Sequence, residues 1–280
     1  MTKKQTQKVS SNQKKQKQDN NDSTLGLLTF GGHLEVFRQM LFRILGVAGV
    51  IAAVVFCFKD ITWELLLAPS EWNFCTYRWI EWAMKTVGFD FHFDEFHVEM
   101  IATDLSSQFM THITTAVYLG VLGASPYILY ELFRFISPAL YENERKYSVQ
   151  VAGIIYMLFI LGVLMSYFVL FPISFRFLGT YSVSARVVSN ITLDSYISTF
   201  VSLTLVMGVV FQLPVIAFFL GKLGVVTSGT LSNYRKHSFI VIMLVAAIIT
   251  PPDLMTLILV TIPLYLLYEV SIRVVKIVEK

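Results

Sequence analysis

The chain has 280 residues, of which 55% are hydrophobic and only 15% are charged, and its mean hydropathy is +0.63. This composition is too apolar for an ordinary soluble domain, and the chain is too long for a single membrane anchor. Two cysteines cannot form a disulfide framework, and a net charge of +3 gives a nucleic-acid-binding protein little support, so the sequence predicts an all-α polytopic membrane protein.

The first 24 residues are rich in Lys, Gln, Asn and Ser and contain almost no large apolar side chain. This composition predicts a disordered cytoplasmic tail over 1–24. No apolar region of the length that a cleavable signal needs precedes Gly31, so we expect no such signal there. Residues 25–280 are then expected to form a single transmembrane domain of six helices.

Six runs free of Asp, Glu, Lys and Arg indicate the membrane spans. A helix that crosses a hydrocarbon core of about 30 Å needs about 20 residues, and the first four expected spans reach that length. The last two runs are shorter and flank the motif Thr-Pro-Pro-Asp that ends at Asp253, so they predict two short helices in a hairpin. The expected spans are about 40–58, 108–130, 149–171, 196–220, 237–251 and 254–270.

The distribution of basic residues predicts the orientation in the membrane. With six spans both termini share one side, and that side holds all but five of the 22 lysines and arginines. The positive-inside rule therefore predicts that both termini are cytoplasmic. The extracytoplasmic segment 59–104 carries all four tryptophans, which favours helices at the outer membrane interface. His92 and His97 in this segment lack a fixed metal-ligand spacing, and we expect no metal site and no cofactor.

A charged turn, FISPALYENERKYS, lies between the second and third expected spans, from Phe135 to Ser148. Arg145 and Lys146 are explained by the positive-inside rule alone. Glu144 is not, because acidic residues contribute little to topology. A carboxylate on this face can accept forked hydrogen bonds from the guanidinium of a partner.

Several segments, in their order and spacing, resemble the TatC family between about His33 and Glu269. They are HLEVFR, MIATDLSSQF, FISPALYENERKY, FQLPV, RKHSFIVIMLVAAIITPPD and IPLYLLYE. The resemblance implies the core subunit of the twin-arginine translocase, which exports folded proteins across the cell inner membrane with the proton-motive force. It implies binding of twin-arginine signal peptides at the cytoplasmic face, recruitment of TatA-type single-span partners, with a TatB-type partner where one exists, and a homo-oligomer within a larger complex. It implies neither an enzyme nor a nucleic-acid partner.

The resemblance also assigns roles to residues of the charged turn. Glu144 matches the recognition glutamate of the family, and Phe135 and Pro138 match the residues that shape its loop. Arg145 lies beside Glu144 and is counted with this expected signal-peptide site.

A second expected element precedes the first span, where the family pattern reads roughly HLxELRxR. Arg38 fits this pattern, but Val36 stands where the pattern has its glutamate, and Met40 replaces the second arginine. Glu35 is adjacent to Val36. One helical step turns a side chain by about 100°, so Glu35 can replace the missing carboxylate only if the helix starts late or rotates.

Three polar residues in or beside the later spans have open roles. Gln212 is expected to face another helix or a wet cavity, either as an amide bonded to a carbonyl freed by Pro214 or as part of the translocation path. Asp253 is expected to cap the last helix, with partner binding as the alternative. Glu269 is equally open between a structural role and a partner contact.

The competing hypothesis is a secondary transporter of a small solute or ion. Such proteins commonly contain inverted repeats and buried ionisable residues. The sequence contains no convincing repeat, and the interiors of the expected spans carry no Asp, Glu, Lys or Arg. An intramembrane enzyme has less support, because no Ser/His/Asp set or metal-ligand pair occurs at a matching depth.

Overall fold

The computed structural model describes residues 30–90, 92–136, 148–182, 184, 190–250 and 253–279. The chain divides into two units, Met1–Val47 and Ala48–Lys280. Helix α2 (Phe30–Cys57) belongs to both, because the part up to Val47 lies in the first unit and the part from Ala48 begins the other.

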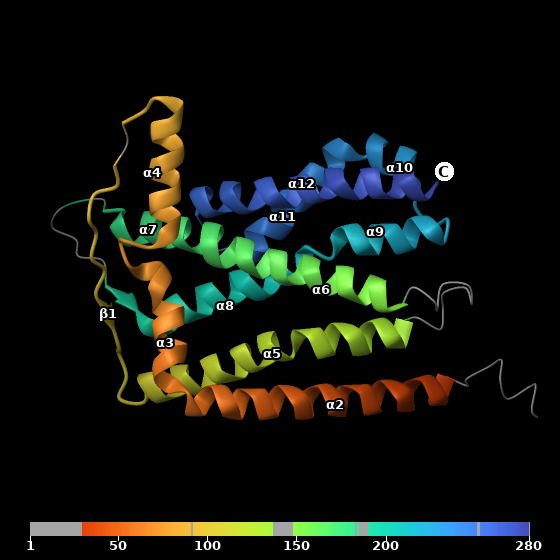
Figure 1. Ribbon diagram of the computed structural model, residues 1–280, viewed down its shortest axis with the longest axis horizontal. Helices are drawn as coiled ribbons and strands as arrows, with labels where there is room; N and C mark the ends of the chain where they lie inside the picture. The colour runs from red at the N-terminus through yellow and green to blue at the C-terminus, as the bar shows by residue number, and fades with distance from the viewer. Residues whose placement is uncertain are drawn as a thin grey trace, which may run out of the picture. The chain divides into compact units, whose positions relative to one another are not determined.

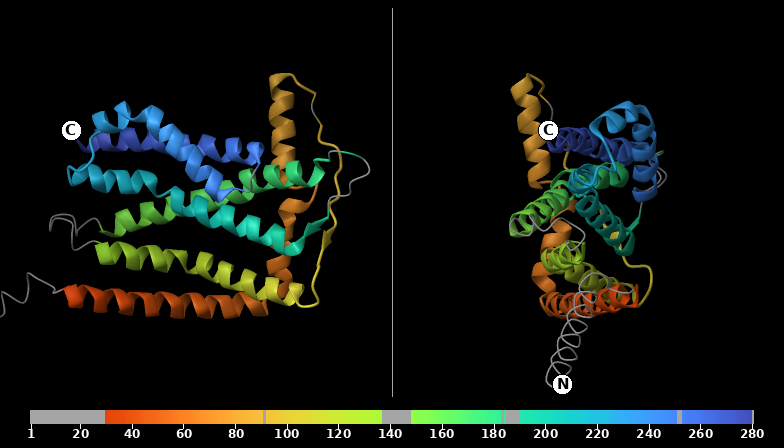
Figure 2. Two further views of the ribbon diagram at one scale, coloured as in Figure 1. Left: turned by 180° about the vertical axis from the view of Figure 1, so that it is seen from behind. Right: turned by 90° about the vertical axis from the view of Figure 1, so that its right-hand side faces the viewer.

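Long helices that lie side by side form most of the second unit, and shorter ones cross their ends (Figures 1 and 2). The crossing helices α3 and α4 lie in segment 59–104, where the sequence predicted helices at the membrane interface. Helix α4 ends at Gly88, whose φ of 94° lies in the left-handed region that favours glycine. The helices of this unit after α2 are α3 (Lys59–Leu67), α4 (Cys75–Val87), α5 (Ser107–Ile136), α6 (Ser148–Met165), α7 (Phe171–Thr180), α8 (Leu193–Val210), α9 (Leu213–Lys222), α10 (Ser228–Asn233), α11 (Arg235–Ile249) and α12 (Leu254–Val278).

Short irregular turns interrupt several of these helices. A 3-10 turn over Ala68–Ser70 follows α3, and a π-helical turn over Ser166–Leu170 joins α6 to α7. Phe211 and Gln212 separate α8 from α9, and Pro214 occupies the first turn of α9, where its missing N–H costs no helical hydrogen bond. Helices α6 and α7 therefore continue in nearly one direction as a single long span, and so do α8 and α9 (Figure 1).

Glycines allow the long helices to approach closely. A Cβ added at Gly162 on α6 would lie 2.5 Å from the carbonyl oxygen of Met207 on α8. A Cβ at Gly208 would lie 2.6 Å from the ring of Phe159. Small residues at such contacts are the usual means by which membrane helices associate. The buried residues of the main cluster are Leu66, Leu170, Phe171, Phe175, Tyr196, Ile197, Phe200, Val201, Leu203, Met207, Phe211, Ile242, Ala246, Val260 and Leu264.

Two short strands add a parallel pairing that the sequence did not predict. Strand β1 (Met100–Ile101) pairs with β2 (Ile191–Thr192), with Met100 opposite Ile191. The pairing joins the extended chain before α5 to the start of α8. It is too small to change the fold class, which is all-α as predicted.

Five stretches of the described chain are long and apolar enough to cross a membrane. Helix α11 has 15 residues and is not among them, so the count of six spans stays a prediction. Helix α12 has 25 residues, so the prediction that both of the last helices are short was wrong for this one. The charges after Tyr268 do not end the helix, because Glu, Arg and Lys are good helix formers. The five stretches are Leu34–Cys57, Ser107–Phe135, Val151–Thr180, Leu193–Lys222 and Leu254–Val278.

Candidate functional site

The first expected recognition element lies on α2 and exposes a charged pair. Arg38 Nη2 donates to Glu35 Oε1 at 2.9 Å, and Gln39 Nε2 donates to the same oxygen at 3.2 Å. Both charged side chains are about half exposed or more, at 48% for Glu35 and 66% for Arg38. Helix α2 already begins at Phe30, so Glu35 is a regular helical residue and the helix does not start late. Glu35 and Arg38 are therefore brought together, one helical turn apart.

The second expected element is described only at its beginning. Phe135 lies in the last turn of α5 and is half-buried. Pro138, Glu144 and Arg145 lie outside the described residues, so their roles stay predictions.

Gln212 is buried and links two long spans. Its Nε2 donates to the carbonyl oxygen of Ile155 on α6 at 3.0 Å. Gln212 therefore faces another helix, which is one of the two surroundings expected for it. The bonded carbonyl belongs to α6 and is not the one freed by Pro214, so that interpretation was wrong, and a role in the translocation path stays a prediction. The amide oxygen Oε1 is also buried and has no hydrogen-bond partner among the described residues. Gln212 also lines a cavity of about 420 Å³ whose other walls come from α5, α6, α8 and α9.

Asp253 caps α12, as one of the two sequence interpretations predicted. Its Oδ1 accepts a hydrogen bond from the backbone N–H of Thr256 at 2.7 Å, and its backbone is extended. The carboxylate satisfies an N–H that would otherwise have no helical acceptor. A partner contact by Asp253 stays a prediction.

Glu269 is engaged inside the fold. Its carboxylate binds Arg235 of α11, with Nε 2.8 Å from Oε1 and Nη2 3.0 Å from Oε2. The hydroxyl of Tyr265 donates to Oε1 at 3.3 Å. This arrangement supports the structural interpretation of Glu269 and explains how a carboxylate is tolerated near the end of a span.

An arginine at the opposite end of the spans forms a cluster that the sequence analysis missed. The guanidinium of Arg176 lies 4.2 Å from the ring centre of Phe93, 4.7 Å from that of Phe96 and 5.3 Å from that of Tyr77. Its Nη2 also donates to the carbonyl oxygen of Asp94 at 3.0 Å. Burial raises the pKa of the Tyr77 hydroxyl, while the positive charge of Arg176 opposes that rise. In the sequence, the only signal for this Arg176 cluster is the concentration of aromatic residues in 89–96.

The geometry therefore describes a membrane-embedded helical scaffold with an exposed carboxylate and guanidinium pair on α2. A model of the family described as Sec-independent protein translocase protein (TatC) matches residues 32–263. The chain belongs to the TatC family. It is thus a subunit of a Sec-independent protein translocase, and not an enzyme, as the resemblance implied.

Individual relatives agree with the family match. The TatC protein of Blattabacterium sp. subsp. Periplaneta americana is 33% identical over 253 residues, which cover 88% of this chain and 94% of the relative. The TatCy protein of Bacillus subtilis is 38% identical over 175 residues, covering 62% and 69% of the two chains.

A solved structure has the same fold. The crystal structure named Twin Arginine Translocase Receptor TatC superposes with a TM-score of 0.71 at 29% identity. The match covers 89% of this chain and 100% of that structure. The TatC fold therefore extends over nearly all of the described chain.

Proposed function

We propose that this TatC-family subunit binds twin-arginine signal peptides of folded proteins at its cytoplasmic face and recruits TatA-type single-span proteins for export driven by the proton-motive force. The observation that carries the proposal is the match along the full length of a structure named as a twin-arginine translocase receptor. The protein is a multi-pass membrane protein. We place it in the cytoplasmic membrane with both termini in the cytoplasm, on the distribution of its basic residues.

The chemistry of Glu35 supports recognition of arginine. Its carboxylate already accepts a hydrogen bond from one guanidinium, that of Arg38, at an exposed position on α2. A signal peptide that carries two adjacent arginines presents the same group twice. Arginine offers a planar fork of donors that a carboxylate can bind through both oxygens, whereas the ammonium of lysine cannot form this geometry. Glu144 supplies a second carboxylate in the proposed site.

Export in cells tests the proposal. The gene is expressed in a bacterial strain that lacks its own TatC-family protein, together with TatA-type partners from the source of this chain. The reporter is a folded fluorescent protein that carries either an Arg-Arg or a Lys-Lys signal. We expect export of the Arg-Arg reporter only, and loss of export when a protonophore collapses the membrane potential.

The variants Glu144→Gln and Glu142→Gln provide the matched comparison, because both remove one negative charge from the same turn. Glu144→Gln is expected to lower export strongly, and Glu142→Gln is expected to leave it near the wild-type level. Equal export of the two reporters by the wild-type protein would contradict the proposal.

A further inference from the structure

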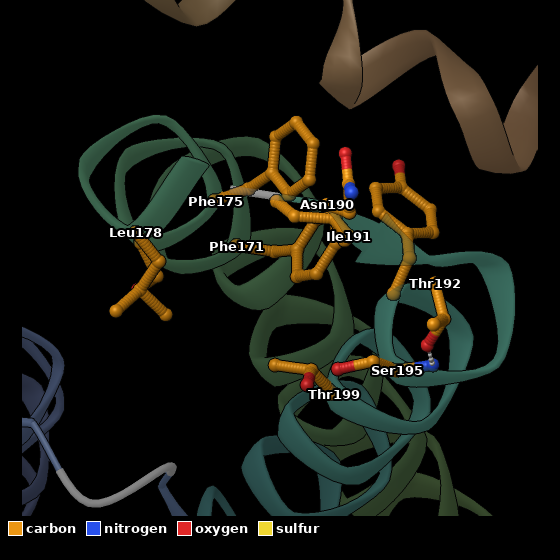
Figure 3. A pocket seen from close by; sticks show the side chains of 10 residues that line it. Phe171, Phe175, Leu178, Asn190, Ile191, Thr192, Ser195 and Thr199 are labelled. Carbon is orange, nitrogen blue, oxygen red and sulfur yellow. Dashed lines mark hydrogen bonds between the residues drawn. The ribbon is translucent and has the colours of Figure 1, made fainter. Parts of the chain in front are cut away.

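A second cavity, of about 420 Å³, opens between α7 and the start of α8 (Figure 3). Two candidate spans, Val151–Thr180 and Leu193–Lys222, have their ends beside it. A cavity at the end of membrane-spanning helices lies at the depth of the lipid interface, where acyl chains meet polar groups. The residues that line it are Phe171, Ser174, Phe175, Leu178, Asn190, Ile191, Thr192, Ser195, Tyr196 and Thr199.

The two walls of this cavity differ in chemistry. On the α7 side Phe175 and Leu178 present apolar surface, and on the α8 side Ser195 and Thr199 present hydroxyl groups (Figure 3). A ligand that fits both walls is amphipathic. The Thr192 hydroxyl is already used, because it accepts the backbone N–H of Ser195 at 3.2 Å as the cap of α8.

The lining carries no Asp, Glu, Lys or Arg among the described residues. Tyr196 is the ionisable residue of the lining, and its hydroxyl donates to the carbonyl oxygen of Leu66 at 2.7 Å, so it is engaged elsewhere. An ionised group inside this cavity would have no opposite charge to offset its desolvation. The part of the ligand that enters is therefore uncharged.

Ser174 gives the lining a hydrogen-bonding requirement. Its side chain is 2% exposed, and its Oγ has no hydrogen-bond partner among the described residues. A hydroxyl without a partner in an apolar surrounding is costly. Serine and threonine hydroxyls can donate as well as accept, so a carbonyl oxygen on a ligand satisfies them as an acceptor.

We propose that this cavity binds the glycerol-ester region of a membrane lipid. The ester carbonyl accepts hydrogen bonds from the hydroxyls of Ser174 and Thr199, and the start of an acyl chain lies along Phe171, Phe175 and Leu178. An ester carbonyl is uncharged and can accept from these hydroxyls, which fits a lining that carries no charge among the described residues. Lipid is also the molecule that surrounds these helix ends at the highest concentration. The proposal rests on the membrane location of the chain and is independent of signal-peptide recognition.

Photolabelling in lipid nanodiscs tests it. The probe is an ester-linked phosphatidylcholine with a diazirine close to the glycerol, and labelled peptides are identified by mass spectrometry after irradiation. We expect concentrated labelling within residues 171–199. The double variant Ser174→Ala, Thr199→Val removes two hydroxyls at nearly constant volume and is expected to lower this labelling about tenfold. Ser202→Ala, an exposed change on the same helix, is the control and is expected to leave it unchanged.

Two competition experiments use the wild-type protein and so do not depend on the folding of a variant. Unlabelled ester phosphatidylcholine is expected to compete well, and a diether analogue, which lacks the carbonyls, to compete poorly. Anionic phosphatidylglycerol esters are expected to compete as well as phosphatidylcholine, because none of the described residues that line the cavity is charged. Uniform labelling of all lipid-facing helices, equal competition by the diether, or a clear preference for the anionic lipid would each overturn the proposal. Displacement of the label by an added single-span TatA-type protein, with no effect of competing lipid, would also overturn the proposal, because the cavity would then bind a protein and not a lipid.

Discussion

Arg235 and Glu269 form a forked ion pair between α11 and α12, with Nε 2.8 Å from Oε1 and Nη2 3.0 Å from Oε2. Helix α11 presents many exposed apolar side chains, among them Ile240, Leu244 and Ile248. The ion pair is one specific link between this helix and α12, beside the edge contact of the Phe239 and Tyr265 rings.

Neutralising this pair should weaken the protein modestly. The Arg235 side chain is 46% exposed and that of Glu269 is 25% exposed, so solvent screens much of the attraction. We expect Glu269→Gln to lower the free energy of unfolding by about 1 kcal/mol. A double-mutant cycle with Arg235→Gln, measured by thermal unfolding in detergent, gives the coupling, and the exposed neighbour change Lys236→Gln is the control. A coupling of zero would show that the forked geometry adds no stability.

The close contact of α6 and α8 should not tolerate a methyl group. At Gly162 an added Cβ would lie 2.5 Å from the Met207 carbonyl oxygen, which belongs to the backbone and cannot move away easily. We expect Gly162→Ala to destabilise the protein by about 1–3 kcal/mol. Gly153→Ala on the same helix is the matched control, because nothing lies within 4 Å of its added Cβ. Unfolding midpoints that change equally in the two variants would contradict this packing.

The aromatic cluster around Arg176 should hold the extended chain of residues 92–96 against α4 and α7. Arg176→Lys keeps the charge but loses the planar group that lies over Phe93 and Phe96. We expect local opening to become easier by about 1 kcal/mol, which corresponds to hydrogen exchange about fivefold faster in this segment. Arg78→Lys, an exposed change on α4, serves as the control and should leave the exchange rate unaltered.

The contact between Glu279 and α10 should depend on pH. The Glu279 carboxylate accepts hydrogen bonds from the hydroxyl of Ser228 and from its backbone N–H, the latter at 2.7 Å, and these bonds lower the carboxyl pKa below its ordinary value of 4.5. A lowered folded-state pKa means that the contribution is fully present above pH 4.5 and is lost as pH falls through the lowered pKa. The protection of the Ser228 amide, which is the intrinsic exchange rate divided by the observed rate at the same pH, should therefore fall in acid. Glu279→Gln should remove that pH dependence, and a pH dependence that persists in this variant would argue against the contact.

Local signals in the sequence were sufficient to predict the helix cap at Asp253 and the all-α fold. The motif that ends at Asp253 predicted a helix cap because a proline pair followed by aspartate restricts the backbone within a few residues. The long apolar runs predicted an all-α membrane fold for a similar reason, since every backbone polar group in lipid must be satisfied within its own helix.

Contacts between distant segments could not be predicted. Arg176 meets Phe93 across 83 positions of the chain, and Gln212 bonds to Ile155 across 57 positions. No local pattern specifies such partners. The length of α12 was underestimated because Glu269 was treated as the end of an apolar run, whereas charged residues that favour helices continue α12 to Val278.

Direct binding of signal peptides tests the central claim. The measurement is the affinity of the purified protein in nanodiscs for an Arg-Arg signal peptide and for its Lys-Lys analogue, in the wild type, in Glu144→Gln and Glu35→Gln, and in the control Glu142→Gln. We predict that the wild type binds the Arg-Arg peptide at least about tenfold more tightly, which is the difference expected for one forked charge-assisted contact. Glu144→Gln should abolish this preference, and Glu142→Gln should retain it. Equal affinities of the wild type for the two peptides would contradict the account.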